Sequence, residues 1–277
     1  ILDFAEQSIF NIAEGGTKTG FVHIREAMME VFDHLKLLKT DKEAALGMPT
    51  GFSDLDKVLV GMGEGDLVRP GMGKTSFTMN VAANVARTKK KTVCVFSLEM
   101  SAAQLVSRMI SSEARVDSYN IRKGTLSADE WTSIAKASSI LSECDILIDD
   151  TSGMTVAGMR AKLRRIKNLG LVVIDYLQLM QSDKRTDNRV NEVADISRNL
   201  KLLAKDLKVP VITCAQLSRG PESRENKRPM LSDLRDSGAI EQDADIVMFL
   251  YRDEYYKDSE ESQNTAEIIV AKNRHGA

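Results

Sequence analysis

The residues best suited to chemistry lie in a glycine-containing turn, which reads Arg69, Pro70, Gly71, Met72, Gly73, Lys74, Thr75 and Ser76. Glycines let backbone N–H groups approach phosphate oxygens, a lysine reaches the outer phosphates, and a threonine hydroxyl holds Mg²⁺. Apolar residues at Phe77, Val81 and Val85 predict a helix whose N-terminus points at the anion. The turn therefore predicts a phosphate-binding loop; the alternative is a chance Gly-Lys-Thr in a surface turn.

Two features of this loop depart from the usual pattern. Val68 stands five residues before Gly73, where a glycine is usual, and residues 65–68 offer almost no strand before Arg69. A phosphate-binding loop normally follows a strand. We therefore expect that chain residues are missing between Val68 and Arg69.

Asp175 directly follows the apolar run Leu171 to Ile174. Four apolar residues and then a carboxylate form the Walker B arrangement. Because Mg²⁺ prefers one or two carboxylates together with phosphates, a strand end can place Asp175 beside the metal held by Thr75. We expect Thr75 and Asp175 to form the metal side of the site.

Two further polar residues follow predicted strands. Glu99 comes after the run 92–97 and could orient an attacking water, or it could simply favour the dipole of the next helix. Gln216 follows the run 209–214, and its amide could sense a γ-phosphate. The alternative for Gln216 is an ordinary loop amide.

Cationic residues near positions 235 and 272 could also contact phosphates. Lys272 and Arg274 project the same way from an extended chain, and we see no helix for them to cap. They could form an arginine finger for a neighbour's nucleotide or a solvated basic end. Arg235 and the backbone near Gly238 could hold phosphates of a nucleic-acid strand, although an ordinary charged turn has the same composition.

The overall composition limits the kinds of partner. The chain has 277 residues, of which 43% are hydrophobic and 28% charged, and a formal net charge of −2. A protein that coats nucleic acid over a broad face usually reads as basic, so any contact here must be local. We see no apolar run long enough for a membrane and no signal peptide, and we expect a soluble, intracellular chain. Three scattered cysteines make a zinc site improbable.

The order of predicted elements indicates an α/β fold. Residues 1–13 and 24–38 read as short helices, and strands and helices alternate from residue 46. Capping boxes at Ser101 and Ser127 begin two helices, and Thr155 begins another. The uniformly apolar strands favour a parallel sheet covered by helices on both faces, with strands expected at 92–97, 146–148, 171–174, 209–214, 246–250 and 268–271.

Four short motifs and two features near the end of the chain together carry a resemblance to a known family. Residues 97–100, 173–180, 215–219 and 234–238 resemble the motif series of bacterial DnaB-type replicative helicases, and Asp245 and residues 272–274 fit its end. The resemblance runs in order from about Gly47 to the last residue. It implies a RecA-like P-loop NTPase fold for residues 46–277, a mainly parallel sheet flanked by helices, preceded by a helical linker over residues 1–45.

The resemblance also assigns roles to the candidate residues. It implies an ATP-dependent motor in which Lys74 and Thr75 bind phosphates and Mg²⁺ and Asp175 is the metal-side acid. Glu99 would activate water, and Gln216 would sense the γ-phosphate. The cations that would reach the neighbouring subunit's nucleotide are Lys272 and Arg274. The residues that would face DNA are Arg235, Asp236 and Gly238, although the family more often has Glu at position 236.

The implied partners follow from the same family. They are single-stranded DNA, five further copies of the chain in a hexameric ring, a helicase loader, and primase through an N-terminal domain absent from this chain. The expected location is the cytoplasm. Two alternatives stay open: a RecA-type recombinase, and a nucleotide-switched DNA-binding scaffold without unwinding. A metabolite kinase is less favoured, since no substrate lid is evident around the loop.

Overall fold

A computed structural model describes residues 24–41, 46–69, 74–182, 188–217, 224, 226–253, 265–274 and 276 of the chain. The chain divides into two units, Ile1–Leu46 and Gly47–Ala277. The helix expected over residues 1–13 lies outside the described residues. In the first unit, α2 spans Ile24–Thr40, as the sequence predicts to within two residues, and most of its large apolar side chains are exposed.

The second unit is built on one seven-stranded sheet with the strand order β3-β2-β4-β5-β1-β6-β7. All neighbours pair in parallel except β6 and β7, which are antiparallel. The strands are β1 Leu67–Arg69, β2 Thr92–Ser97, β3 Ile146–Asp149, β4 Leu169–Asp175, β5 Val211–Thr213, β6 Ile246–Tyr251 and β7 Glu267–Asn273. This arrangement confirms the predicted mainly parallel α/β fold.

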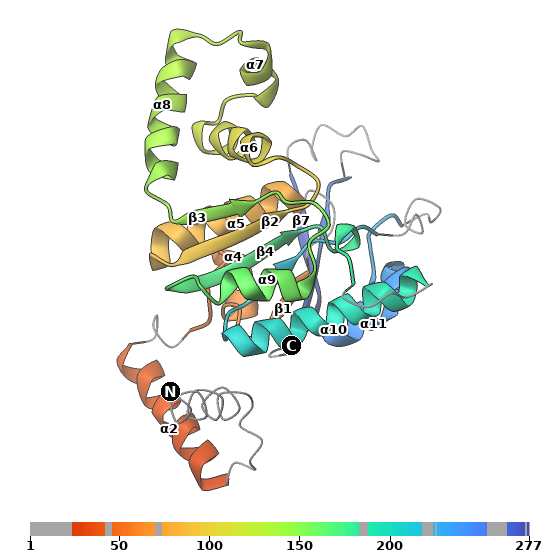
Figure 1. Cartoon of the computed structure of the whole chain (residues 1–277). Helices are drawn as coiled ribbons and strands as arrows, with labels where there is room; N and C mark the ends of the chain where they lie inside the picture. Colours follow the sequence, from red (N-terminus) through yellow and green to blue (C-terminus); the bar gives the residue numbers. More distant parts are fainter. Residues whose placement is uncertain are drawn as a thin grey trace, which may run out of the picture. The chain divides into compact units, whose positions relative to one another are not determined.

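Helices cover both faces of this sheet because side chains alternate along each strand. Val93 and Val95 of β2 join a core with α4 (Ser53–Leu59), α5 (Lys74–Lys89) and α6 (Ala102–Ala114). Cys94 and Phe96 join the opposite core with α9 (Val156–Leu163) and α10 (Arg189–Leu207). Figure 1 shows α9 and α10 in front of the sheet and α5 behind it.

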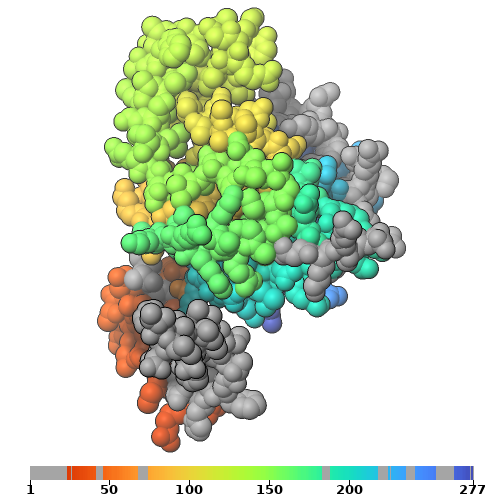
Figure 2. Space-filling model, viewed as in Figure 1, coloured from red at the N-terminus to blue at the C-terminus, as the bar shows by residue number. Residues whose placement is uncertain are grey.

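The remaining elements lie outside these two layers. Helices α7 (Ser118–Lys123) and α8 (Ala128–Ser142) form, with α6, a yellow-green lobe at the top of the second unit (Figure 2). Short turns of helix complete the chain as η1 (Leu177–Leu179), η3 (Leu231–Ser237) and α11 (Gly238–Asp243). No helix in the described ranges has the length and apolar character needed to cross a membrane.

Local sequence signals explain where several helices begin. Ser101 and Ser127 each accept a backbone hydrogen bond from the residue three positions on, and Gln104 and Glu130 bond back. Both predicted capping boxes are therefore confirmed. The Thr155 hydroxyl likewise accepts a hydrogen bond from Gly158 N at the start of α9.

The expectation of missing residues before the phosphate loop stays a prediction, and in this chain these positions form a short strand. Val68 pairs with Ile212 and Ile246, and Arg69 pairs with Val247. These residues form β1, a strand of three residues between β5 and β6. The neighbouring strands fix this short strand, which is why its own sequence gives so weak a signal.

Candidate nucleotide site

The predicted catalytic residues other than Lys272 and Arg274 gather at one edge of the sheet. We call the edge where the parallel strands end the carboxyl edge, and the opposite one the amino edge. Asp175 ends β4, Glu99 follows β2 by two residues, Gln216 follows β5 by three, and Lys74 begins α5. Strands β2, β4, β5 and β1 are consecutive in the sheet. Open α/β sheets bind ligands at this edge.

The centre of the site is a contact between Thr75 and Asp175. The Thr75 hydroxyl donates to Asp175 Oδ2 at 2.5 Å. Asp175 is 2% exposed, and its Oδ1 is buried and accepts no hydrogen bond. A buried carboxylate oxygen without a partner is costly unless a ligand satisfies it. A hydrated Mg²⁺ held by Thr75 fits this unsatisfied acceptor.

Lys74 lies on the same side of the site. It is the first residue of α5, and its ammonium lies 5.0 Å from the centre of the Tyr176 ring. A ring face attracts a cation, so Tyr176 holds the ammonium beside Asp175 at the carboxyl edge. The sequence did not single out Tyr176. Of the rest of the motif, Ser76 is an exposed residue of α5, and the backbone of Arg69 ends β1. The positions outside the described residues are Pro70, Gly71, Met72 and Gly73.

Glu99 is an exposed residue in the bend that follows β2. Two hydrogen bonds shape this bend: Leu98 N donates to Asp175 O at 2.7 Å, and the Ser97 hydroxyl donates to Met100 O at 2.6 Å. The first bond ties the chain one residue before Glu99 to the backbone of Asp175. Glu99 therefore follows the residue bonded to Asp175, and its exposed side chain can face a ligand. This position is compatible with both roles considered for it, the orientation of an attacking water and a favourable charge near the next helix.

Gln216 is held through its backbone. Its N–H donates to Gln178 Oε1 at 3.3 Å, and Gln178 Nε2 donates to Gln216 O, also at 3.3 Å. The side chain of Gln216 is exposed, so the amide can face a ligand while the backbone stays fixed. Gln178 belongs to η1, after β4. Sequence reasoning missed it, although it lies within the motif at residues 173–180.

Cys214 lies beneath the site as an unreactive thiol. Burial raises its pKa well above the ordinary value, and the negative charge of Asp175 raises it further. The thiol therefore stays protonated. Among the described residues, no three or more His, Cys, Asp or Glu side chains gather in a way that could hold a metal ion.

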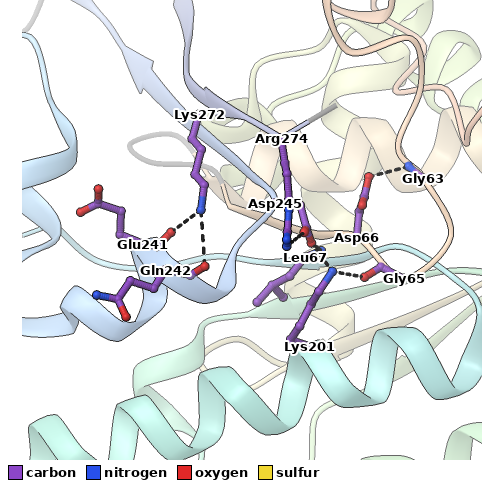
Figure 3. A network of polar contacts seen from close by, with 10 residues as sticks. All are labelled: Gly63, Gly65, Asp66, Leu67, Lys201, Glu241, Gln242, Asp245, Lys272 and Arg274. Atoms are coloured by element: carbon purple, nitrogen blue, oxygen red, sulfur yellow. Dashed lines mark hydrogen bonds and ion pairs between the residues drawn. The ribbon is translucent and has the colours of Figure 1, made fainter. Parts of the chain in front are cut away.

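Lys272 and Arg274 lie at the amino edge, away from the four residues above, because β7 runs antiparallel to its neighbour. Arg274 N donates to Asp245 O at 2.9 Å, just before β6 begins. Lys272 Nζ donates to Glu241 O at 2.7 Å and to Gln242 O at 3.4 Å (Figure 3). The inference that these cations have no helix to cap is therefore wrong for Lys272, since those carbonyls belong to the last turn of α11.

Asp245 joins the elements of this edge. Its buried carboxylate accepts from Lys201 Nζ, from Leu67 N at 3.1 Å and from Arg274 at 3.4 Å (Figure 3). Burial raises the pKa of Asp245, but these hydrogen bonds and the Lys201 charge outweigh it and leave the pKa lowered. The carboxylate therefore ties β1, α10 and the end of β7 together. The motif series includes Asp245, but no sequence signal pointed to Lys201.

The backbone of Arg235 and Asp236 lies in η3, and Gly238 begins α11. Their side-chain positions lie outside what the structure describes. Asp233, at the start of η3, is buried; it pairs with Arg224 and accepts from Met230 N at 2.8 Å. The entry into this segment is therefore anchored.

The sequence and the fold of this chain are similar to those of known proteins. The family model described as "DnaB-like helicase C terminal domain" matches residues 47–277. The replicative DNA helicase DnaC of Bacillus subtilis is 46% identical over all of this chain, which covers 63% of that protein. A solved structure described as an ATPase domain superposes with a TM-score of 0.86, 36% identity and 93% coverage of both chains.

A second solved structure, described as a DnaB-like replicative helicase and its interactions with primase, has a TM-score of 0.83 and 36% identity. The superposition covers 99% of this chain and 67% of the chain in that structure. The chain thus spans less than two thirds of the length of the curated relatives it matches.

Proposed function

Since the chain belongs to the family of DnaB-like helicase C-terminal domains, we propose that it is the ATP-dependent motor of a replicative DNA helicase. It would hydrolyse ATP, translocate on single-stranded DNA and unwind the duplex at the replication fork. The observation that carries the proposal is the Thr75–Asp175 contact with its unsatisfied Oδ1. That arrangement suits a metal-bound nucleotide at the carboxyl edge.

The residues of the edge divide the work of phosphoryl transfer. Lys74 would neutralise the outer phosphates, and Thr75 and Asp175 would hold Mg²⁺, which supplies positive charge to the transferred group. The loop residues 69–73 and Ser76 would surround the phosphates. Glu99 would accept a proton from the attacking water, and Gln216 would contact the γ-phosphate. Gln178 fixes the backbone of Gln216. A γ-phosphate that binds the Gln216 side chain would therefore act on the segment that follows β5.

Strand geometry supports a role for Lys272 and Arg274 on another copy of the chain. Four strand spacings separate β4 from β7, about 19 Å. Along the strand direction, Arg274 lies at the level of Leu67, and strand pairing places Leu67 at the level of Val172. Val172 precedes Asp175 by three residues, which is about 10 Å of extended chain. Together these give a separation of about 21 Å from Asp175. These cations are therefore better placed for a neighbour's nucleotide than for their own.

A site shared between copies suits the assembly that we propose, a hexamer around single-stranded DNA. Arg235, Asp236 and Gly238 would contact DNA phosphates, and a few contacts per subunit agree with the net charge of −2. We also propose that a loader places the ring on DNA and that primase binds through a domain outside this chain. The structure described with primase supports this for a relative. The motor would act in the cytoplasm.

The test is ATP hydrolysis and strand separation by Lys74→Ala, with Lys136→Met as the control. Lys136 is an exposed residue of α8, remote in sequence from the edge. We expect Lys74→Ala to lose hydrolysis and unwinding, because positioning and charge neutralisation make up most of this catalysis. Undiminished hydrolysis in Lys74→Ala would refute the assignment.

A second variant separates the motor from the alternatives. Arg274→Ala should cut DNA-stimulated hydrolysis while leaving nucleotide binding intact, because its cation acts on the neighbour. Binding of DNA with nucleotide but no hydrolysis in the unmodified protein would favour a scaffold. Hydrolysis with open filaments instead of closed rings would favour a recombinase, and electron microscopy distinguishes the two.

A further inference from the structure

The ammonium of Lys272 stabilises a helix in its own subunit. It donates to Glu241 O and Gln242 O, which lie in the last turn of α11 (Figure 3). Carbonyls at a helix C-terminus have no partner within the helix, and a cation there offsets the helix dipole. Lys272 is half-buried, so this contact is not a solvated surface pair.

The helix that Lys272 caps continues the segment proposed to face DNA. Gly238 begins α11 directly after η3, which contains Arg235 and Asp236. The start of η3 is anchored by the buried Asp233 and its partner Arg224. Residues 234–243 therefore have the Asp233–Arg224 pair at their beginning and the Lys272 cap at their end.

The two cations of β7 differ in how firmly their own subunit holds them. The Arg274 side chain is 67% exposed, and its NH1 contacts Asp245 at 3.4 Å. It can leave that contact at a small cost, because its guanidinium is mostly solvated and the buried Asp245 keeps Lys201 as a partner. Lys272 cannot leave without exposing two carbonyls of α11. Two of the three N–H donors of this ammonium go to the carbonyls of α11, so a neighbour's phosphate that takes more than one donor would compete with those carbonyls.

We propose that Lys272 is a positioning residue for the DNA-facing segment, capping α11 when the neighbour's site is empty and releasing it when that site holds nucleotide. The inference rests on the proposed function, because it takes Lys272 to be a cation that reaches across. It adds a direct link from one subunit's nucleotide to the DNA-facing segment of the next.

The test is hydrogen exchange at the amides of residues 238–243 in the full chain. The proteins are wild type, Lys272→Met, which keeps the apolar stem, Lys272→Arg, which restores a cation, and the control Lys136→Met. Without nucleotide, we expect exchange about fivefold faster in Lys272→Met than in wild type, from the lost cap and its hydrogen bonds. Lys272→Arg and Lys136→Met should stay near wild type.

A non-hydrolysable ATP analogue with Mg²⁺ supplies the readout that a purely structural role would not move. If nucleotide draws Lys272 away, the difference between wild type and Lys272→Met disappears when the analogue binds. A difference that persists with bound analogue overturns the inference, as does an unchanged Lys272→Met without nucleotide. Direct measurement of analogue binding keeps the two claims distinct: absence of binding refutes the proposed function itself, and the inference falls with it.

Discussion

Replacing Asp245 by asparagine removes the charge that joins three elements at the amino edge. The carboxylate side chain is 3% exposed and that of its partner Lys201 is 16% exposed. Breaking a buried pair by removing one partner costs about 3–5 kcal/mol. Lys201 keeps a hydrogen bond to Gly65 O at 2.8 Å and some access to water, so we expect a loss of about 3 kcal/mol.

Urea unfolding of the purified chain measures this loss, and thermal unfolding gives an independent value. For a domain of this size, a loss of about 3 kcal/mol lowers the Tm by roughly 6–12 °C. The variant should also change how the free energy of unfolding depends on pH in acid. Because the pKa of Asp245 is lowered below its ordinary 3.8, its contribution is present above that pH and is lost as pH falls through the folded pKa. Asp245→Asn should lack that part of the acid-induced loss.

A double-mutant cycle tests the reasoning itself. In Asp245→Asn with Lys201→Met, neither charge is left buried alone, so the cost should be smaller than the sum of the two single costs by about 2 kcal/mol. The control is Asp54→Asn in the Lys57–Asp54 pair, whose side chains are 75% and 92% exposed, and it should cost under about 0.5 kcal/mol. Additive single costs, or an Asp245→Asn loss below about 1 kcal/mol, would show that the pair does not anchor this edge.

Three further predictions concern the cap of α8, the site and the cysteines. Ser127→Ala should cost about 1 kcal/mol in urea unfolding, because it removes the acceptor at the start of α8; a neutral result would contradict the cap. Gln178→Leu should lower ATP turnover about tenfold with KM little changed, since two hydrogen bonds to the Gln216 backbone are lost, and a change confined to KM would count against this. Burial and the Asp145 charge raise the pKa of Cys94 to about 11, so its reactive thiolate gains population only as pH rises toward that value. Mass spectrometry of native protein alkylated at about pH 8 should find Cys144 modified before Cys94, and the reverse order would refute the prediction.

Local signals predicted much of the fold. The capping boxes at Ser101 and Ser127 need only residues within one turn, and uniformly apolar strands need only a few neighbours, so both could be read from the chain. The strand β1 could not, because three residues carry too little pattern and pairing with β5 and β6 decides their structure. Tertiary context overrides a weak local preference of this kind.

The candidate site divides in the same way. Asp175 and Lys74 were identified because each is part of a short motif. The role of Gln178 depends on where β4 ends relative to β5, and that register cannot be read from sequence. The Lys272 cap joins residues 30 positions apart, so the chain alone gave no reason to pair them. Contacts that depend on how strands and helices meet therefore had to come from the structure.

The antiparallel direction of β7 affects how many complete ATPase centres an assembly of this chain contains. If each complete ATPase centre takes the carboxyl edge of one copy and the amino edge of the next, then centres are equal in number to the contacts between copies, not to the copies themselves. A ring of n copies has n centres, an open row has n − 1, and a lone copy has none. Turnover per chain would then rise with assembly, and one copy deficient at its amino edge would disable its neighbour's centre while its own stayed intact.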